Sequence, residues 1–141
     1  MKTFKQIIFW ILSLTWGLPM TLVGAFVALY CLIRGNKPKH FYQNVYFVFP
    51  SGGWGFNCGP FFFLTADAEH LNMKQHECGH GIQNIIFGPF MPFIVSIPSA
   101  IRFYYREWLV STGKKKCSDL SPYDSAWFEG MATKLGEKFY K

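Results

Sequence analysis

Two histidines and a glutamate stand at a spacing that can hold and use a metal ion. In the string His76-Glu77-Cys78-Gly79-His80 the imidazoles are four residues apart, which places them on one face of an α-helix. Two such imidazoles can converge on a tetrahedral Zn²⁺. Glu77 lies about 100° further around the helix and can reach a metal-bound water as general base. The pattern predicts zinc-dependent hydrolysis of peptide bonds.

A catalytic zinc site takes three protein ligands, so a third is needed. Glu129 is the candidate, because it lies in a later helical pattern on a narrow face of small side chains formed by Ser125, Ala132 and Gly136. Gly79 costs its helix about 1 kcal/mol relative to alanine, and close contact with that face would offset this cost. We therefore predict that the two helices pack closely and present His76, His80 and Glu129 to one metal.

Ordinary structural roles remain as alternatives for the same residues. The two histidines could be buried helix residues satisfied by the backbone, and Glu129 could be an exposed helical glutamate. The motif and Glu129 together favour the ligand interpretation. Cys78 points away from the metal side of its helix and is expected to be a packing residue. His40 is expected to lie at a membrane interface and not to be a ligand.

Start and stop signals outline the elements that must position these residues. Asn72 and Gln75 resemble a capping box and Gly88 ends the pattern, so a motif helix is predicted over residues 73–87. Ser121 and Pro122 supply an N-cap and a first-turn proline for a last helix that runs to about Phe139.

Between residues 41 and 65 the chain is rich in aromatic and β-branched residues and is broken by glycine-proline turns. Asn44–Phe49 and Phe61–Thr65 are predicted to be strands, which could pair as a long hairpin.

The N-terminal region has the composition of a membrane span. Residues 7–33 contain no charged residue, and a helix of that length covers roughly 40 Å, enough to cross a hydrocarbon core of about 30 Å. One transmembrane helix is predicted, which Pro19 could kink, since each half is too short to span separately. A cleaved signal peptide is disfavoured because its apolar core would be only about 7–15 residues long.

Composition also favours a membrane. The chain is 50% hydrophobic and 16% charged, with a net charge of +6, whereas a soluble protein has about 25% charged residues. Basic residues flank the apolar segments and do not line one face, which argues against nucleic acid as a partner. All 14 lysines and arginines except Lys2 and Lys5 follow the apolar segment, so the catalytic part is expected to be cytoplasmic. The four cysteines form no C-x-x-C pair and are expected to be reduced thiols.

A second apolar segment, residues 89–105, is interrupted by prolines and is a poor candidate for a crossing. It is predicted to be re-entrant or interfacial. If His80 and Glu129 share one ion, residues 81–128 must leave the site and return to the same side of the membrane, which also excludes a single crossing there.

The H-E-x-x-H motif, followed by Glu129, Ala132 and Gly136 as E-x-x-A-x-x-x-G, resembles the gluzincin zinc peptidases, in particular the membrane-bound CAAX-processing type. In that family a glutamate on a second helix completes the metal site, often with an aspartate where Thr133 stands here. Short strings around the two helices, such as His80-Gly81-Ile82-Gln83 and Ile97-Pro98-Ser99, also resemble small uncharacterised bacterial zincin-like membrane proteins. The resemblance implies that Phe61–Thr65 binds extended peptide along its edge.

An active enzyme also needs groups that orient the imidazoles and stabilise the tetrahedral intermediate. The candidates are Asp67, His70, Asn84, Tyr105 and Tyr123. His70 could equally be a loop residue without a role.

The expected fold is α+β, with a minimal zincin-like core made of a motif helix, a small strand unit and a C-terminal ligand helix. Residues 1–35 would form the transmembrane anchor and residues 36–141 the metallopeptidase domain. The expected protein is an integral membrane protein of a bacterial inner membrane that uses Zn²⁺ to cleave peptides or membrane proteins. The alternatives are a non-catalytic membrane protein that keeps the zinc-helix scaffold for partner or metal binding, and a small helical membrane protein without metal.

Overall fold

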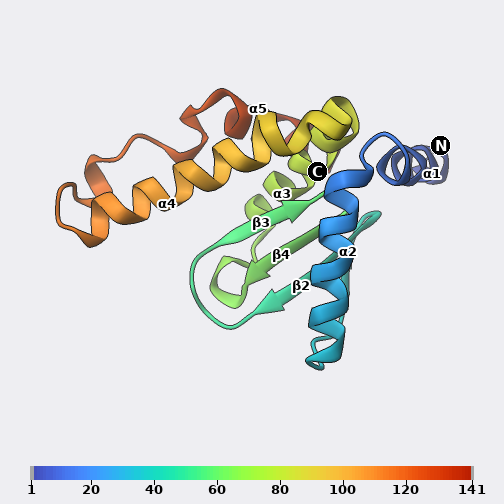
Figure 1. Cartoon of the computed structure of the whole chain (residues 1–141), viewed down its shortest axis with the longest axis horizontal. Helices are drawn as coiled ribbons and strands as arrows, with labels where there is room; N and C mark the ends of the chain where they lie inside the picture. Colours follow the sequence, from blue (N-terminus) through green and yellow to red (C-terminus); the bar gives the residue numbers. More distant parts are fainter. Residues whose placement is uncertain (1, 141) are drawn as a thin grey trace.

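The computed structural model describes residues 2–140, which fold as an α+β domain, as the sequence predicts (Figure 1). Two helices come first, α1 (Lys2–Leu14) and α2 (Leu18–Ile33). The strands are β1 (Lys39–Phe41), β2 (Asn44–Phe49), β3 (Gly55–Cys58) and β4 (Phe61–Thr65). The chain ends with α3 (Leu71–Phe87), α4 (Ile97–Ser111) and α5 (Trp127–Phe139).

The sheet has the strand order β1-β2-β4-β3. Strands β2 and β4 lie at their predicted positions, but they pair in parallel, so the predicted hairpin between them is wrong. Strand β3 instead forms the hairpin with β4, across a tight turn at Gly59 (φ 68°). As a consequence β4 is a central strand, and the edge beside it belongs to β3. The expectation that Phe61–Thr65 offers a free edge to a peptide is therefore wrong as well.

Both faces of the central strands are buried, which explains their nearly continuous run of apolar residues. Phe47 and Phe63 are paired across β2 and β4 and stack at a ring distance of 5.9 Å. Their neighbours Tyr46 and Phe62 stack at 4.8 Å on the opposite face. Each face of the sheet thus carries its own aromatic pair.

Helices cover the two faces and make a three-layer structure. On one face Met20, Ala28 and Cys31 of α2 pack against the pair formed by Phe47 and Phe63. On the other face the aromatic pair packs with Cys78 of α3 and with Tyr140 after α5. Figure 1 shows α2 running across the strands. Cys78 is therefore a packing residue, as predicted, and α2 contributes directly to the core.

The prediction of one helix over residues 7–33, which Pro19 could kink, is wrong, because the segment forms two helices, α1 and α2, that meet at an angle of 94°. Pro19 lies in the first turn of α2, where a proline is well tolerated. Asn84 of α3 donates its side-chain amide to the carbonyl of Gly17 at 3.2 Å, and Thr21 donates its hydroxyl to the carbonyl of Ser13 at 2.6 Å. Backbone groups freed by the break are thus satisfied by contacts within the domain.

Within residues 2–140 no individual helix combines the length and the hydropathy needed to cross a membrane. Two bent pairs reach that threshold by length and composition when their members are taken together. They are α1 with α2, and Leu71–Phe90 with Pro92–Ser111, which are bent by 116°.

The motif helix begins two residues earlier than predicted. His70 is its N-cap, and its ring accepts a hydrogen bond from the backbone N–H of Met73 at 3.3 Å. The predicted capping box at Asn72 is therefore wrong. His70 gains a structural role from this contact.

The segment between the two metal-site helices leaves the core and returns. After a π-helical turn (Pro92–Ser96) the chain forms α4, which extends away from the sheet, and residues 112–126 come back alongside it (Figure 1). Helix α5 begins at Trp127 and not near Ser121. Arg102 and Arg106 donate hydrogen bonds to the carbonyls of residues 121–123, which lie outside the α-helix.

Candidate metal centre

The imidazoles of His76 and His80 converge on the carboxylate of Glu129. Both Nε2 atoms lie near the same oxygen, Oε2, at 3.0 Å for His76 and 3.1 Å for His80. Their ligand atoms all lie within 4.8 Å of one another. With bonds of about 2.0–2.2 Å, ligand atoms around a tetrahedral zinc stand roughly 3–3.5 Å apart. This group can therefore hold a metal ion with small adjustments of the side chains.

Close packing of α3 on α5 makes this convergence possible. Gly79 and Gly136 lie where the two helices meet, each against the backbone of the other helix, near Ala132 and Gln75 respectively. Side chains larger than hydrogen at these two positions would push the helices apart. The close contact predicted between Gly79 and the small face of α5 is confirmed.

The second nitrogen of each imidazole has a partner that fixes the ring. Nδ1 of His80 lies 2.7 Å from Oε1 of Gln83, whose own amide donates to the carbonyl of Phe128 at 2.7 Å. Because that amide group is used as a donor, its oxygen must accept from His80. Nδ1 therefore carries a proton, which leaves Nε2 as the nitrogen that can face a metal.

Thr133 plays the corresponding role for His76, with its hydroxyl 2.9 Å from Nδ1. The partner of this ring is thus a neutral hydroxyl. Sequence reasoning did not identify Gln83 as a ring partner, and it named Thr133 only as the position at which the resembling peptidases often carry an aspartate. The available signal was helical spacing, since Gln83 lies three residues after His80 and Thr133 four residues after Glu129.

Glu129 is fully buried, yet both of its oxygens have partners. Oε1 accepts a hydrogen bond from the hydroxyl of Ser99 in the first turn of α4. Burial tends to raise the pKa of the Glu129 carboxyl, but the hydrogen bonds from His76 and His80 outweigh it and hold this pKa below its usual range. The carboxylate form, which a cation needs, is thus favoured. Ser99 is a further site residue that sequence reasoning did not identify.

Glu77 is only 3% exposed and lies on the side of α3 that faces β3. Its oxygen Oε2 has no hydrogen-bond partner within the described part of the chain. Burial raises the pKa of its carboxyl to about 7, with His76 lowering it and Glu129 raising it. Asn57 of β3 donates to the backbone carbonyl of Glu77 at 2.8 Å. A buried carboxylate of this kind can take and return a proton near neutral pH.

Four of the five candidates for supporting roles lie elsewhere. Asp67 accepts hydrogen bonds from the backbone amides of Gly52 and Gly53, and Asn84 and His70 have the structural roles described above. Tyr105 is 58% exposed.

Tyr123 is the candidate that the fold brings to the site. Its ring centroid lies 6.4 Å from that of His76. Burial, the nearby charge of Glu129 and other smaller effects leave the pKa of its phenol raised to about 12, so the hydroxyl keeps its proton at neutral pH.

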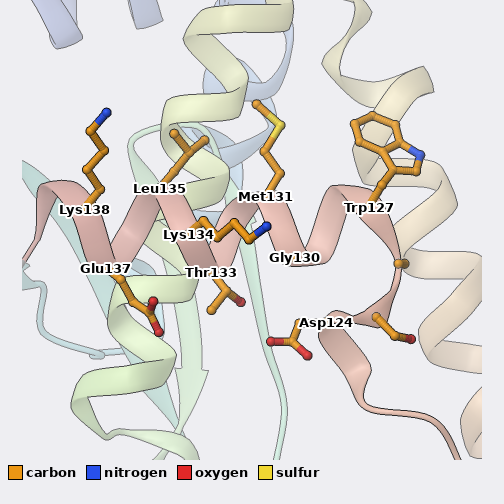
Figure 2. A pocket seen from close by; sticks show the side chains of 11 residues that line it. Asp124, Trp127, Gly130, Met131, Thr133, Lys134, Leu135, Glu137 and Lys138 are labelled. Atoms are coloured by element: carbon orange, nitrogen blue, oxygen red, sulfur yellow. The ribbon is translucent and has the colours of Figure 1, made fainter.

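An open groove of about 760 Å³ runs beside α5 (Figure 2). Thr133, the ring partner of His76, is part of its lining, so the groove passes close to the metal-binding group. Figure 2 shows Thr133 and Asp124 extending toward the same space, from α5 and from the turn before it.

Comparison of the chain with protein-family models, with curated proteins and with solved structures found no match.

Proposed function

We propose that this protein is a zinc-dependent metallopeptidase in which His76, His80 and Glu129 hold the metal. The single observation that carries the proposal is the position of Glu77. A buried carboxylate with an unpartnered oxygen lies on the same helix as two imidazoles that meet a second, anionic carboxylate. Two imidazoles and one carboxylate are a donor set that suits catalytic zinc.

Glu77 is the general base of the proposed reaction. Bound Zn²⁺ would supply Lewis acidity to the scissile carbonyl and to the attacking water. Glu77 accepts a proton from that water and delivers it to the leaving amine. Gln83 and Thr133 hold the imidazoles so that Nε2 of each faces the metal position.

An extended peptide is the substrate that fits the surroundings. Within the described sheet, β3 is the edge strand next to the motif helix, with one side paired to β4. Gly55 of this strand lies close to Glu77, since a Cβ there would be 3.1 Å from Oε1. A peptide that pairs with the outer edge of β3 would bring its backbone carbonyls toward Glu77.

A membrane location is supported by large apolar side chains on the outer faces of two helices, α2 and α4. The exposed fraction is 71% for Phe26 and 75% for Ile33 of α2, and 64% for Ile101 of α4. Near the ends of these two helices a cation lies over an aromatic ring: Arg34 over Tyr30, and Lys114 over Trp108. Apolar faces that end in aromatic and basic residues are typical of proteins that contact lipid. We therefore propose membrane proteins or membrane-proximal peptides as substrates.

Metal analysis combined with a peptide library tests the proposal. The purified full-length wild type and the Glu77→Gln variant are each expected to hold about one zinc per chain, but only the wild type should hydrolyse peptides. His80→Ala and Glu129→Ala should retain much less zinc, because each removes one of three protein ligands. The control is His40→Ala, an exposed histidine on β1, which should keep both zinc and activity.

The same experiment separates the alternatives. Stoichiometric zinc without hydrolysis of any library peptide would favour a non-catalytic scaffold that binds metal. A folded chain without zinc would exclude both the peptidase and the metal-binding scaffold.

A further inference from the structure

Helix α4 has two faces of opposite character, and its polar face is turned toward the metal-binding group. Ser99, Arg102 and Arg106 lie on this face, at spacings of three and four residues. Ser99 donates a hydrogen bond to Oε1 of Glu129, and the two arginines donate to backbone carbonyls of residues 121–123. The polar face of α4 therefore contacts a proposed metal ligand and the turn that precedes its helix.

The opposite face of α4 is apolar and exposed. Its large side chains are Ile97, Ile101, Tyr104, Tyr105 and Trp108. At about 100° per residue, their centre lies roughly half a turn of the helix away from the polar face. Among the described residues of α4, only Leu109 is buried. A surface helix in water turns its apolar face to the core and its polar face outward. The inverted arrangement of α4 indicates that the medium outside it is apolar.

An anionic lipid surface fits the end of this apolar face. Tyr105 and Trp108 stack at a ring distance of 6.1 Å, and Nζ of Lys114 lies 4.4 Å from the centre of the Trp108 ring. Lys115 and Lys116 follow and are exposed. Aromatic rings beside a group of lysines suit the headgroup region of anionic lipids. A second copy of the chain fits less well, because it would bring a further net charge of +6 to the same surface.

The position of α4 can respond to the surface that it meets, because so little of the helix is buried. A π-helical turn, Pro92–Ser96, precedes it, and residues 112–126 follow with only short 3₁₀ turns. Detachment of α4 would leave the guanidinium groups of Arg102 and Arg106 without their carbonyl partners. Water can replace those partners, but lipid cannot. Lipid therefore favours the attached helix more strongly than water does.

Attachment of α4 decides how Glu129 is held. Its oxygen Oε1 accepts from Ser99, while Oε2 lies near the imidazoles of His76 and His80. Glu129 is fully buried, so Oε1 would lose its partner without gaining water, which costs free energy and lets the carboxylate rotate. Loss of a group that orients a metal ligand usually lowers metal affinity by about 10–100-fold.

We propose that the apolar face of α4 binds an anionic bilayer, and that this binding raises the zinc affinity of the metal group by keeping Ser99 on Glu129. The inference rests on the proposed metal site and adds its regulation, since the protein then holds zinc most tightly at the membrane. Coupling between two sites is reciprocal, so zinc must raise the affinity for the bilayer by the same factor.

Zinc affinity measured with and without vesicles tests the coupling. The vesicles contain equal parts of phosphatidylcholine and phosphatidylglycerol, and vesicles of phosphatidylcholine alone are the neutral comparison. For the full-length wild type, competition with a zinc chelator should give a zinc Kd about 5–150-fold lower with anionic vesicles, the usual range for coupled sites. Flotation with and without zinc should show the same factor in the affinity for the vesicles.

Two variants separate the two faces of α4. The double variant Ile101→Ser, Tyr104→Ser should keep the zinc affinity of the wild type in water but lose its increase with vesicles. Ser99→Ala should float like the wild type, bind zinc about 10–100-fold more weakly and lose most of the response to vesicles. Phe139→Ser, at an exposed position of α5, is the control and should match the wild type in both measurements.

The outcomes that overturn the inference are distinct from those that overturn the proposed function. If the wild type floats with vesicles but its zinc affinity does not change, the inference is wrong and the metallopeptidase proposal stands. Failure to float overturns it as well, as does a dimer in sedimentation that the double variant abolishes. A full response to vesicles in Ser99→Ala overturns the route through Glu129.

Two results concern the proposed function itself. A folded wild type that binds no zinc with or without vesicles overturns the metal site, and this inference with it. Zinc binding that responds to vesicles as expected, without cleavage of any peptide, supports the inference and overturns only the peptidase activity.

Discussion

Gly79 of the motif helix faces the backbone of Ala132 on α5 so closely that a Cβ at Gly79 would overlap the Ala132 carbonyl. Gly136 meets the backbone of Gln75 in the same way one turn further along. The two contacts set the distance between α3 and α5. They therefore also set the distance from His76 and His80 to Glu129.

Gly79→Ala is expected to destabilise the fold and weaken zinc binding together. Alanine by itself favours a helix by about 1 kcal/mol over glycine. A net decrease in the free energy of unfolding would therefore come from the overlap with Ala132. Overpacking of this kind costs about 1–3 kcal/mol. Urea unfolding and zinc titration measure the two effects. Lys134→Ala, at an exposed position of α5, is the control, and a Gly79→Ala variant more stable than wild type would contradict the close contact.

Gln83→Leu should weaken zinc binding while leaving the fold intact. Leucine has a similar size but cannot accept the proton of His80 Nδ1, so the ring loses the partner that orients it. Removal of such a partner usually reduces metal affinity by about 10–100-fold. Competition with a zinc chelator measures the change, with Gln6→Leu on α1 as the control. Equal zinc affinity in Gln83→Leu and wild type would show that the contact does not support the site.

Stability should decrease in acid through Glu69 on the side of the sheet that faces α3. A hydrogen bond from Lys39, supported by one from Tyr46, lowers the pKa of the Glu69 carboxyl in the folded state. The corresponding stabilisation is present above the unfolded pKa of about 4.3 and is lost as the pH falls through the lower, folded value. Urea unfolding between roughly pH 6 and pH 2 measures this contribution. The free energy of unfolding should fall less in acid for Lys39→Met than for the wild type. If the free energy of unfolding changed equally with pH in the two proteins, this contribution would be excluded.

Serine substitutions on the outer face of α2 should reduce binding to vesicles. Phe26 and Ile33 are largely exposed, so their loss should change the free energy of unfolding little. Insertion of one such side chain into lipid contributes about 1.5–3 kcal/mol, which predicts at least a tenfold weaker partition for Phe26→Ser. Flotation with anionic vesicles measures the partition. Phe139→Ser, on α5, is the control, and unchanged flotation of Phe26→Ser would contradict a lipid-facing α2.

Sequence patterns were sufficient to predict a feature when all the residues that define it lie in a single helix or strand. The His76 and His80 spacing, the small face around Glu129 and the composition of Asn44–Phe49 each depend on the periodicity of a single helix or strand. Helical periodicity determines which residues share a face before any packing occurs. Gly79 added the one long-range clue, because a glycine inside a helix implies close approach of another element.

Contacts between distant segments decided the rest. The bend between α1 and α2 depends on Asn84, 67 residues beyond the Gly17 carbonyl that it contacts, and carbonyls of the residues before α5 accept hydrogen bonds from Arg102. The parallel pairing of β2 with β4 is not encoded in either strand, since an apolar strand buried on both faces can accept more than one neighbour.

The sequence alone therefore determined which side chains could bind a metal and on which helices they lie. Only the tertiary structure decided that Ser99, Gln83, Thr133 and Tyr123 surround them, and that β3 is the edge strand beside Glu77. The physical reason is that a hydrogen bond between side chains far apart in sequence leaves no periodic trace, whereas an amphipathic or small-residue face does.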